Sequence, residues 1–331
     1  MASEAPGGDI DILDLRQFRG TQLDGLLALE STEWDRMLDW DYRPSVDLIR
    51  QYVDARILPG YVLVERTRGH VTPRGYGFFV HEGRKGMIGN LFVAPAYRNG
   101  TLEGEQQLLE QMIATLTATP GMERIEAQLM AFPPQSLARC FSDHHFAGFR
   151  RVFLELGLGA APGPAAEGTT HLQDLRLEPW GGASYEEAAR LIQHAYRDHV
   201  DSRINDQYRS FAGAIRFMHN IAHYPGCGTF DASSSYIARS VRHGALEGMI
   251  LTSRVKPDVA HVTQICVLPE RQGQGLGRAL LDRALASLRR QRLRAVTLTV
   301  TGENQGALAL YRSVGFVDLN EFDAYVWERI A

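Results

Sequence analysis

ICVLPERQGQGLGR, residues 265–278, is the most informative stretch of the sequence. It reads as the end of a strand that turns at Pro269 and enters a helix through Gly273, Gly275 and Gly277. Because glycine has no Cβ, the backbone of such a loop can approach a ligand closely. The amide groups and the positive dipole end at the first turn of a helix favour a phosphate. The stretch therefore predicts an anion site, as in proteins that bind a phosphorylated cofactor.

Spacing excludes two other phosphate loops. A G-x-G-x-x-G dinucleotide fingerprint that starts at Gly273 or Gly275 would need its third glycine at Arg278 or Leu280. A P-loop needs a lysine followed by serine or threonine, and this stretch contains no lysine. A glycine-rich helix entry without a ligand remains the alternative on this stretch alone.

The residues around the glycine loop alternate between strand and helix patterns. Three strand-like runs precede it with connections too short for a helix, which predicts antiparallel pairing. An amphipathic helix with Leu281, Leu285 and Leu288 on one face follows it. We expect a mixed α/β sheet with a crossover helix. The predicted strands cover residues 174–177, 235–241, 246–254, 260–268, 295–301 and 324–328, and the predicted helices cover 185–199, 202–223, 277–291 and 305–314.

The length and one break in composition predict two domains. The chain has 331 residues, more than one typical domain contains. GLGAAPGPAAEGTT at residues 157–170 is rich in Gly, Ala and Pro and has neither helical nor strand periodicity. We expect a linker there, between domains at residues 1–156 and 171–331.

Composition and charge exclude several classes of protein. The formal net charge of −4 argues against a nucleic-acid binder. No apolar run reaches the roughly 18 residues of a membrane span, and residues 1–9 lack the pattern of a secretory signal. Cys140, Cys227 and Cys266 lie too far apart for a disulfide framework or a cysteine-rich zinc site. We expect a soluble cytoplasmic protein with no metal and with neither a nucleic-acid nor a membrane partner.

Two motifs resemble one acyltransferase superfamily. The pattern Q-x-x-G-x-G at residues 272–277, preceded by Val-Leu-Pro at 267–269, resembles motif A of the GNAT (GCN5-related N-acetyltransferase) superfamily. Asn304 and the run LYRSVGF at residues 310–316 resemble the second signature of that superfamily, in the same order and spacing. The resemblance covers residues 260–316 and implies a GNAT fold for the C-terminal half.

The resemblance also implies acetyl-CoA as the cosubstrate and assigns residues to it. Backbone groups of the strand at residues 265–267 would hold the pantetheine arm, and the amides of residues 273–278 would wrap the pyrophosphate. Tyr311 matches the residue that protonates the leaving thiolate, and a thiol pKa of about 8.5 beside a tyrosine pKa of about 10 is compatible with that role. The implied cofactor-binding residues are Ile265, Cys266, Val267, Gln272, Gly273, Gln274, Gly275, Leu276, Gly277, Arg278 and Asn304.

The base that deprotonates the acceptor is the point at which the sequence departs from the resemblance. Ribosomal-protein acetyltransferases of this superfamily carry a glutamate five residues before the asparagine, and this chain has Thr299 there. A hydroxyl cannot serve as the base, so another group or a chain of waters must do so. Glu247 and His261, on neighbouring predicted strands, are the candidates, and a purely structural role is the alternative for each.

The N-terminal half resembles a degenerate second copy of the same pattern. Aligning VAPAYR at residues 93–98 with residues 267–272 places Arg98 on Gln272, Thr101 on Gly275 and Glu103 on Gly277. The run AGF at residues 147–149 likewise aligns with residues 314–316 and places His144 on Tyr311. A threonine and a carboxylate would disfavour a pyrophosphate in this loop. We expect two tandem GNAT-like folds, of which the N-terminal one does not bind the cofactor in the ordinary way.

These inferences predict an acyl-CoA-dependent N-acyltransferase. The reaction that the resemblance implies is direct transfer of an acetyl group, in a ternary complex, to a primary amine of a small molecule or peptide. The alternatives are a coenzyme A-binding sensor or interaction protein without turnover, and a scaffold of two GNAT-like lobes.

Three weaker signals have simpler explanations. His219 and His223 are four residues apart but lack the glutamate of a zinc-protease motif. Cys227 could be a nucleophile, although a turn residue between two glycines is the simpler interpretation. Trp34, Trp40 and Tyr42 lie among aspartates and could form an acceptor patch, with core or surface packing as the default.

Overall fold

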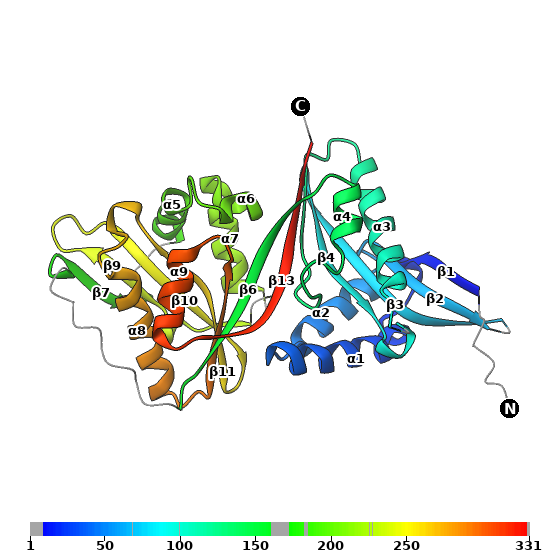
Figure 1. Cartoon of the computed structure of the whole chain (residues 1–331), viewed down its shortest axis with the longest axis horizontal. Coiled ribbons are helices and arrows are strands. Elements are labelled where there is room, and N and C mark those ends of the chain that lie inside the picture. Colours follow the sequence, from blue (N-terminus) through cyan, green and yellow to red (C-terminus); the bar gives the residue numbers. More distant parts are fainter. Residues whose placement is uncertain are drawn as a thin grey trace. The chain divides into compact units, whose positions relative to one another are not determined.

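The chain divides into two compact units that are not the predicted segments. A computed structural model describes residues 9–67, 69–98, 100–159, 172–181, 185–224, 226 and 228–329. The N-terminal unit comprises Met1–Phe149 with Phe322–Ala331, and the C-terminal unit comprises Arg150–Glu321 (Figure 1). The predicted division at residue 156 differs from this, because one strand near each boundary begins in one unit and ends in the other. Residues 160–170 of the predicted linker lie outside the described residues.

The N-terminal unit is a mixed sheet with helices. Its strand order is β1-β2-β3-β4-β5-β13, and β4 and β5 form its parallel pair. The elements are β1 (Asp9–Asp14), α1 (Gly20–Leu38), α2 (Arg43–Asp54), β2 (Gly60–Thr67), β3 (His70–Glu82), β4 (Lys85–Val93), α3 (Glu103–Ala118), β5 (Arg124–Gln128) and α4 (Ala138–Asp143). The last strand comes from the far end of the chain, since residues 324–328 of β13 (Val317–Glu328) pair with β5.

The C-terminal unit repeats this arrangement. Its strand order is β6-β12-β11-β10-β9-β7, with β11 and β12 as the parallel pair and a short β8 beside β10. The elements are β6 (Ala147–Gly157), β7 (Leu175–Pro179), α5 (Tyr185–Ala195), α6 (Asp201–Ile204), α7 (Phe211–His223), β8 (Thr229–Phe230), β9 (Tyr236–Ser240), β10 (Leu246–Lys256), β11 (Val259–Val267), α8 (Leu276–Arg290), β12 (Ala295–Thr301) and α9 (Gln305–Val314). The predicted mixed sheet and its antiparallel first part are confirmed.

One predicted helix is wrong in extent. Residues 202–223 form α6 and α7, separated by a 3₁₀ turn at Asp206–Tyr208. The side chain of Asn205 accepts a hydrogen bond from the backbone of Gln207, and the side chain of Ser210 accepts one from Gly213. Such side-chain caps begin a new helical segment, so the chain turns here although its apolar residues keep a helical spacing.

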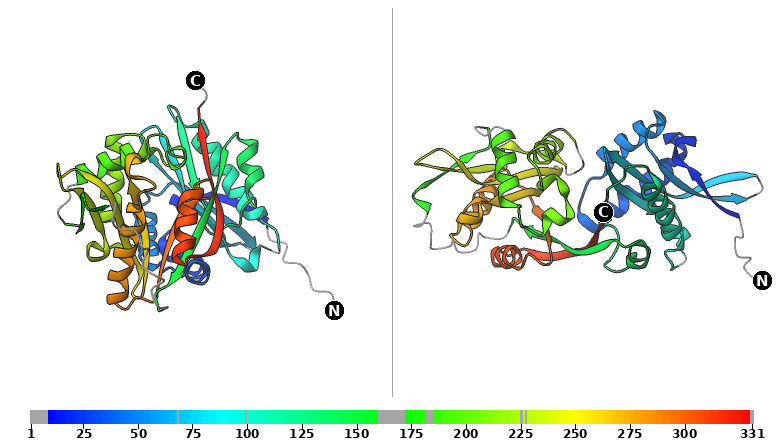
Figure 2. Two further views of the ribbon diagram at one scale, coloured as in Figure 1. Left: turned by 60° about the vertical axis from the view of Figure 1, so that its left-hand side comes forward. Right: turned by 90° about the horizontal axis from the view of Figure 1, so that it is seen from above.

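Helices cover both faces of the C-terminal sheet (Figure 2). Leu280, Leu281 and Leu285 of α8 are buried in one core cluster with residues of β9 to β12. On the other face, Ile192 of α5 and Met218 of α7 belong to a second cluster that includes residues of β9, β10 and β11. The apolar face predicted for residues 277–291 is therefore confirmed, and α8 is packed firmly against the sheet.

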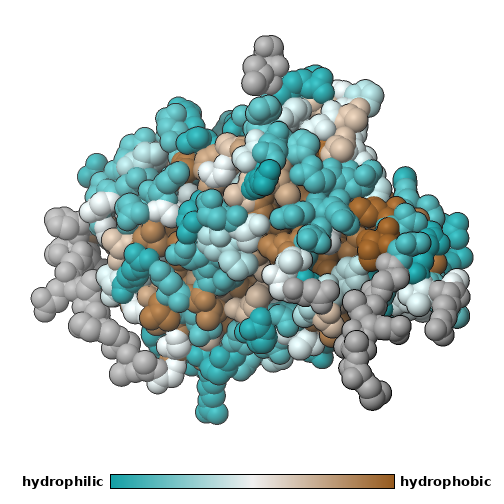
Figure 3. Space-filling model, turned by 45° about the vertical axis from the view of Figure 1, so that its right-hand side comes forward, coloured by the Kyte–Doolittle hydropathy of each residue, from teal (hydrophilic) through white to brown (hydrophobic). Residues whose placement is uncertain are grey.

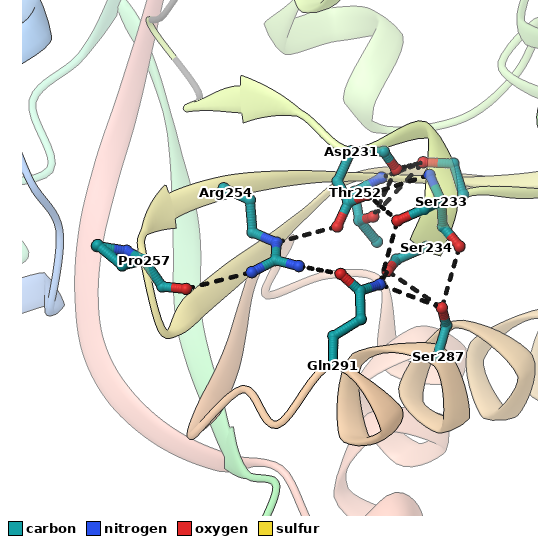
Figure 4. Close-up of polar contacts among 9 residues, drawn as sticks. Asp231, Ser233, Ser234, Thr252, Arg254, Pro257, Ser287 and Gln291 are labelled. Carbon is teal, nitrogen blue, oxygen red and sulfur yellow. Dashed lines mark hydrogen bonds and ion pairs between the residues drawn. The ribbon is translucent and has the colours of Figure 1, made fainter.

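A polar network fixes the C-terminal end of α8 (Figure 4). Arg254 of β10 donates from Nε to Asp231 Oδ2 at 3.0 Å and from Nη2 to Gln291 Oε1. Gln291, which caps α8, donates from Nε2 to Ser234 Oγ at 2.7 Å. Ser234 Oγ in turn donates to Ser287 Oγ of α8 at 3.3 Å.

The surface mixes hydrophilic residues with small hydrophobic groups, as Figure 3 shows for one face. Exposed large hydrophobic side chains are Ile10, Leu29, Ile57, Val71, Met87, Tyr224, Val241, Val317 and Leu319. In the part of the chain that is described, every helix is too short or too polar to cross a bilayer.

The network around Asp231 predicts a loss of stability on substitution of Arg254. Burial would raise the pKa of Asp231, but hydrogen bonds from Ser233 and Arg254 outweigh it and hold the pKa below its ordinary value. We expect Arg254→Ala to lower the free energy of unfolding by about 2 kcal/mol, because a largely buried carboxylate loses its cation. The effect should shrink below about pH 4, where the carboxylate becomes protonated. Urea unfolding followed by circular dichroism measures both.

The matched control is Arg312→Ala. Arg312 forms an exposed ion pair with Asp318 at 2.8 Å, and its removal should lower the free energy of unfolding by less than about 1 kcal/mol. Equal losses in the two variants would contradict the role given to the network.

A buried carboxyl group makes the stability of the N-terminal unit depend on pH. Glu30 of α1 accepts hydrogen bonds from Tyr76 at 2.5 Å, Asn90 at 2.7 Å and Trp34 at 3.3 Å. Burial raises the pKa of Glu30 to about 7, although these donors oppose the shift. Its favourable contribution is complete below the unfolded pKa of about 4.5 and is lost as the pH rises through 7.

We therefore expect the free energy of unfolding of the wild type to fall, relative to that of Glu30→Gln, by about 3 kcal/mol between pH 4.5 and 8. The variant lacks the titrating group, so it lacks this contribution. Urea unfolding at several pH values, followed by tryptophan fluorescence, measures the difference. A difference that does not change with pH would show that Glu30 titrates alike in the folded and unfolded chains.

Candidate functional site

The site begins where two parallel strands stop pairing. β11 and β12 pair only from Val259–Ala295 to Val262–Leu298. Beyond that point β11 stays paired with β10, and β12 stays paired with β6. Thr263 is an extra residue between the pairs Leu251–Gln264 and Thr252–Val262, which makes it a β-bulge. A bulge bends its strand, so β11 turns away from β12 directly after their last pair.

A cavity of about 570 Å³ lies at this opening. Residues of β11 and β12, of the loop before α8, of α9 and of the segment after α5 line it, all from the C-terminal unit. Of the predicted site residues, those that line it are Ile265, Cys266, Val267, Gln272, Gly273, Gly275, Leu276, Gly277, Arg278, Asn304 and Tyr311. Gln274 is not among the lining residues, since its side-chain amide donates to the Glu270 carbonyl at 2.7 Å.

The glycine loop leaves its backbone open to a ligand. Gly273 and Gly275 have φ angles of 73° and 84°, and no other atom lies within 4 Å of a Cβ built on either residue. Gly275 caps α8, so the first amides of that helix follow directly. Arg278 of the first turn lines the cavity and is bonded to Asp282 at 2.9 Å. This geometry has the properties of an anion site.

β11 presents backbone groups to the cavity, whereas the side chain of its Cys266 is buried in the core. The carbonyl of Ile265 accepts a hydrogen bond from the Tyr196 hydroxyl at 3.3 Å. Cys266 is buried in the core cluster of α5 and α7, and burial raises the pKa of its thiol to about 12. The thiol is therefore neutral at physiological pH.

α9 carries the predicted acid. Asn304 caps this helix by accepting from the backbone of Ala307 at 3.1 Å, and Tyr311 lies two turns further on. Tyr311 is 6% exposed. Burial, and secondarily the charge of Asp201, raises the pKa of Tyr311 well above its ordinary value, so its hydroxyl keeps its proton at neutral pH.

The structure does not bring the two base candidates to the cavity. Glu247 is buried and bonded to Arg271 at 2.5 Å. His261 lies where β11 and β12 are still paired, with Nδ1 2.8 Å from the Thr297 hydroxyl and its ring stacked on Phe153. Burial lowers the pKa of His261 to about 3. Neither residue lines the cavity, which corrects their assignment as bases.

Several lining residues were not found from the sequence. Tyr196 and His199 follow the end of α5, Asp201 begins α6, and Arg151 lies on β6. The three-residue spacing of Tyr196 and His199 was a signal, since it places both on one face of a helical turn. For Arg151 the sequence carries no such signal, because strand pairing with β12 brings it to the site.

Comparison with known proteins identifies the domain that holds this cavity. The acetyltransferase (GNAT) family matches residues 190–316. These residues form a GNAT domain. A mycothiol acetyltransferase from Beutenbergia cavernae is 32% identical over 164 residues, which are 49% of this chain and 49% of that protein. The match thus spans about half the length of that relative.

Solved structures resemble the chain over nearly its full length. A GCN5-related N-acetyltransferase from Sphaerobacter thermophilus has a TM-score of 0.67 at 14% identity and covers 96% of this chain and 95% of its own. A tandem GNAT protein from the clavulanic acid biosynthesis pathway has a TM-score of 0.54 at 16% identity, with coverage of 97% and 98%. These likenesses confirm the predicted tandem GNAT fold.

In the N-terminal GNAT-like unit, the residues that align with the site contact other side chains of the same unit. Arg98 donates to Glu105 of α3, which is fully buried. Phe132 is buried in a core cluster that includes Leu91 of β4, and Cζ of Arg98 lies 6.0 Å from the centre of its ring. His144, aligned with Tyr311 of the GNAT domain, lies 2.6 Å from a carboxylate oxygen of Glu110.

The weaker signals do not add to the GNAT site. The rings of His219 and His223 stack 5.9 Å apart, and within the described ranges no three His, Cys, Asp or Glu side chains are grouped as metal ligands. Trp40 and Tyr42 are buried, and Trp34 stacks on Tyr42 at 4.5 Å, so these rings pack rather than form an acceptor patch. Cys227 lies outside the described residues.

Proposed function

We propose that the C-terminal unit is an acyl-CoA-dependent N-acyltransferase that transfers an acetyl group from acetyl-CoA to a primary amine. Transfer is by direct attack in a ternary complex. The observation that carries this proposal is the cavity at the opening between β11 and β12, which joins the anion loop of α8 to Tyr311 of α9. The match of residues 190–316 to the acetyltransferase (GNAT) family supports it.

The residues of the loop fit a coenzyme A pyrophosphate. A side chain at Gly273 or Gly275 would occupy the space that the phosphates need and would be strained at a positive φ. The backbone amides of residues 273–278, with Gln272 and Gln274 in the same loop, would hold the pyrophosphate. Ile265, Cys266 and Val267 would hold the pantetheine arm through backbone groups, with Asn304 on the opposite wall.

Each chemical role falls to a named group of the domain. Acetyl-CoA supplies a thioester whose carbonyl carbon accepts the amine. Tyr311 donates its hydroxyl proton to the leaving thiolate. Because both groups lie in a buried site, the desolvation that raises the pKa of Tyr311 also raises that of a thiolate formed beside it, and proton transfer between them stays close to balanced.

The acceptor is a primary amine of a small molecule or peptide. A similar protein is named for mycothiol, which favours a small molecule. A coenzyme A-binding sensor without turnover is the second candidate, since the anion loop would serve it equally well.

Substitution of Gly275 tests the cofactor site. We expect Gly275→Glu to abolish binding of acetyl-CoA, because a strained side chain and a negative charge enter the loop. The matched control is Gly244→Glu, since Gly244 also has a positive φ of 68° and open space around it but does not line the cavity.

Calorimetric titration with acetyl-CoA gives the affinity and the stoichiometry of each variant. One site per chain in the wild type and in Gly244→Glu is the expected result. Two sites would mean that the N-terminal unit also binds the cofactor, and unchanged binding by Gly275→Glu would contradict the site.

Substitution of Tyr311 separates the enzyme from the sensor. We expect Tyr311→Phe to lower acetyl transfer about 100-fold, because the thiolate loses its acid, while the affinity for acetyl-CoA stays unchanged. Release of free thiol in the presence of a panel of primary amines measures transfer. Tyr224→Phe is the control, since Tyr224 is 55% exposed and outside the cavity. A wild-type protein that binds acetyl-CoA but releases no thiol with any amine would favour the sensor.

A further inference from the structure

The cavity has a polar end that takes no part in the cofactor site described above. Arg151 of β6 donates from Nη1 to Asp201 Oδ1 at 3.0 Å and to Thr301 Oγ1 at 2.5 Å. Thr301 Oγ1 in turn donates to the same Asp201 oxygen. The backbone nitrogen of Asp201 donates to His199 Nδ1 at 3.1 Å. These contacts join β6, β12 and α6, and they hold Arg151 and Asp201 in fixed positions on the wall of the cavity.

Arg151 lies on the face of the sheet opposite to α8. The next residue of β6, Val152, belongs to the core cluster that contains the leucines of α8. Successive side chains of a strand point to opposite faces of the sheet. The glycine loop, which begins α8, and the guanidinium of Arg151 therefore approach the cavity from different faces. With the cofactor held by the glycine loop, the end of the cavity at Arg151 and Asp201 is left for the acceptor.

Arg151 and Asp201 each keep one side without a partner in the part of the chain that the structure describes. Both hydrogen bonds of Arg151 come from Nη1, and its Nε is buried without any. Asp201 accepts both of its side-chain hydrogen bonds at Oδ1, and its Oδ2 lies 3.7 Å from His199 Nδ1, beyond hydrogen-bond distance. Buried donors without a partner are rare in folded proteins. A ligand group is therefore expected beside them.

The neighbouring polar groups of the cavity are already paired. The Tyr208 hydroxyl donates to Gln264 Oε1 at 3.3 Å, and Gln264 Nε2 donates to the Tyr196 hydroxyl at 2.9 Å. Tyr196 in turn donates to the Ile265 carbonyl. Compared with this chain of hydrogen bonds, the Nε–Nη2 edge of Arg151 and Oδ2 of Asp201 are the groups that a ligand would satisfy.

We propose that the acceptor is an α-amino acid, and that Arg151 and Asp201 recognise its carboxylate and its amino group. This inference rests on the proposed function, because it names the class of primary amine that the reaction takes. The Nε–Nη2 edge of a guanidinium matches the two oxygens of a carboxylate in a bidentate pair. The amine donates one N–H to Asp201 Oδ2 and keeps its lone pair for the acetyl carbon.

The charges at this end of the cavity fit an α-amino acid better than other ligands. Its nitrogen and its carboxylate carbon lie about 2.5 Å apart, and Arg151 and Asp201 are themselves in contact at 3.0 Å. An alkylamine would satisfy Asp201 but leave the free edge of Arg151 unpaired. A purely anionic ligand would pair with Arg151 but would be repelled by the Asp201 carboxylate. An amino acid places an opposite charge against each side chain.

Matched acceptors test the role of the carboxylate. The probes are the common L-α-amino acids and their α-amides, which share the side chain and the amino group but lack the carboxylate. We expect Arg151→Gln to lower kcat/KM for the best amino acid about 100-fold, mainly through KM, and to change that of its amide by no more than a few-fold. Release of free thiol from acetyl-CoA measures both reactions. Each probe is compared between wild type and variant, which removes the difference in basicity between the two amines.

A second variant and an equilibrium measurement separate recognition from folding. Arg151→Lys keeps the cation but replaces the planar fork with a point charge, so its loss with the amino acid should be smaller than that of Arg151→Gln and still spare the amide. Calorimetric titration of the amino acid into the complex with coenzyme A should show the same order of affinities without turnover. Wild-type affinity for acetyl-CoA shows that each variant is folded.

The matched control is Arg150→Gln. Arg150 is the preceding residue of β6, is 40% exposed, forms an ion pair with Glu321 at 2.7 Å and does not line the cavity. Its substitution should change neither reaction.

Three results would overturn the inference. Equal losses with the amino acid and its amide would make Arg151 structural. A wild-type protein that acetylates ethylamine but neither binds nor acetylates any α-amino acid would exclude this class of acceptor and leave the proposed function standing. A wild-type protein that binds acetyl-CoA but transfers to no amine would overturn the proposed function, and this inference with it.

Discussion

The end of pairing between β11 and β12 is the constraint on which the candidate site depends. Buried backbone groups require hydrogen-bond partners, so a sheet opens only where other partners take over. β10 and β6 stay paired with the outer edges of the two strands, so the groups on the two facing edges need partners from elsewhere. Within the opening, the Tyr196 hydroxyl binds the Ile265 carbonyl. The extra residue Thr263 also supplies a hydrogen bond, because its hydroxyl donates to the Leu251 carbonyl at 3.1 Å.

The two units share one architecture but differ in their side chains near the opening of the parallel pair. In both, a parallel pair separates after four residue pairs, at Ile88–Ala127 in one unit and at Val262–Leu298 in the other. In the N-terminal unit a buried carboxylate pairs with the arginine of the corresponding loop. The fold alone therefore does not make a binding site; the side chains at the opening decide it.

The sequence predicted the local features well. The predicted bounds of β12 and α9 are those of the structure, since a β-branched run and a side-chain cap each act over a few neighbouring residues. The glycine loop was likewise recognisable, because glycine at a positive φ leaves a direct trace in the sequence. Strand alternation was less informative. It placed Glu247 and His261 on neighbouring strands, but it could not show which part of the sheet is open.

Features that depend on distant segments could not be predicted in this way. In the exchange of strands between the halves, segments far apart in the chain pair with each other. Periodicity predicts that a segment is a strand, but it does not show with which other strand that segment pairs. The contact of Arg151 with Asp201 arises only through that exchange. Asp201 begins α6, beyond the predicted helix at residues 185–199, so the helical spacing did not extend to it. The cofactor loop could thus be predicted from the sequence, whereas the polar group around Asp201 could not.

The exchange of strands has a consequence for dividing the chain. A fragment that begins at residue 171 would lack β6, and the backbone of β12 would present a row of unpaired amides and carbonyls along Ala295–Thr301. A fragment that ends at residue 156 would lack residues 324–328 and leave β5 uncovered in the same manner. Bare edges of this kind pair with other chains. Each half of the chain therefore forms a sheet that only the other half completes.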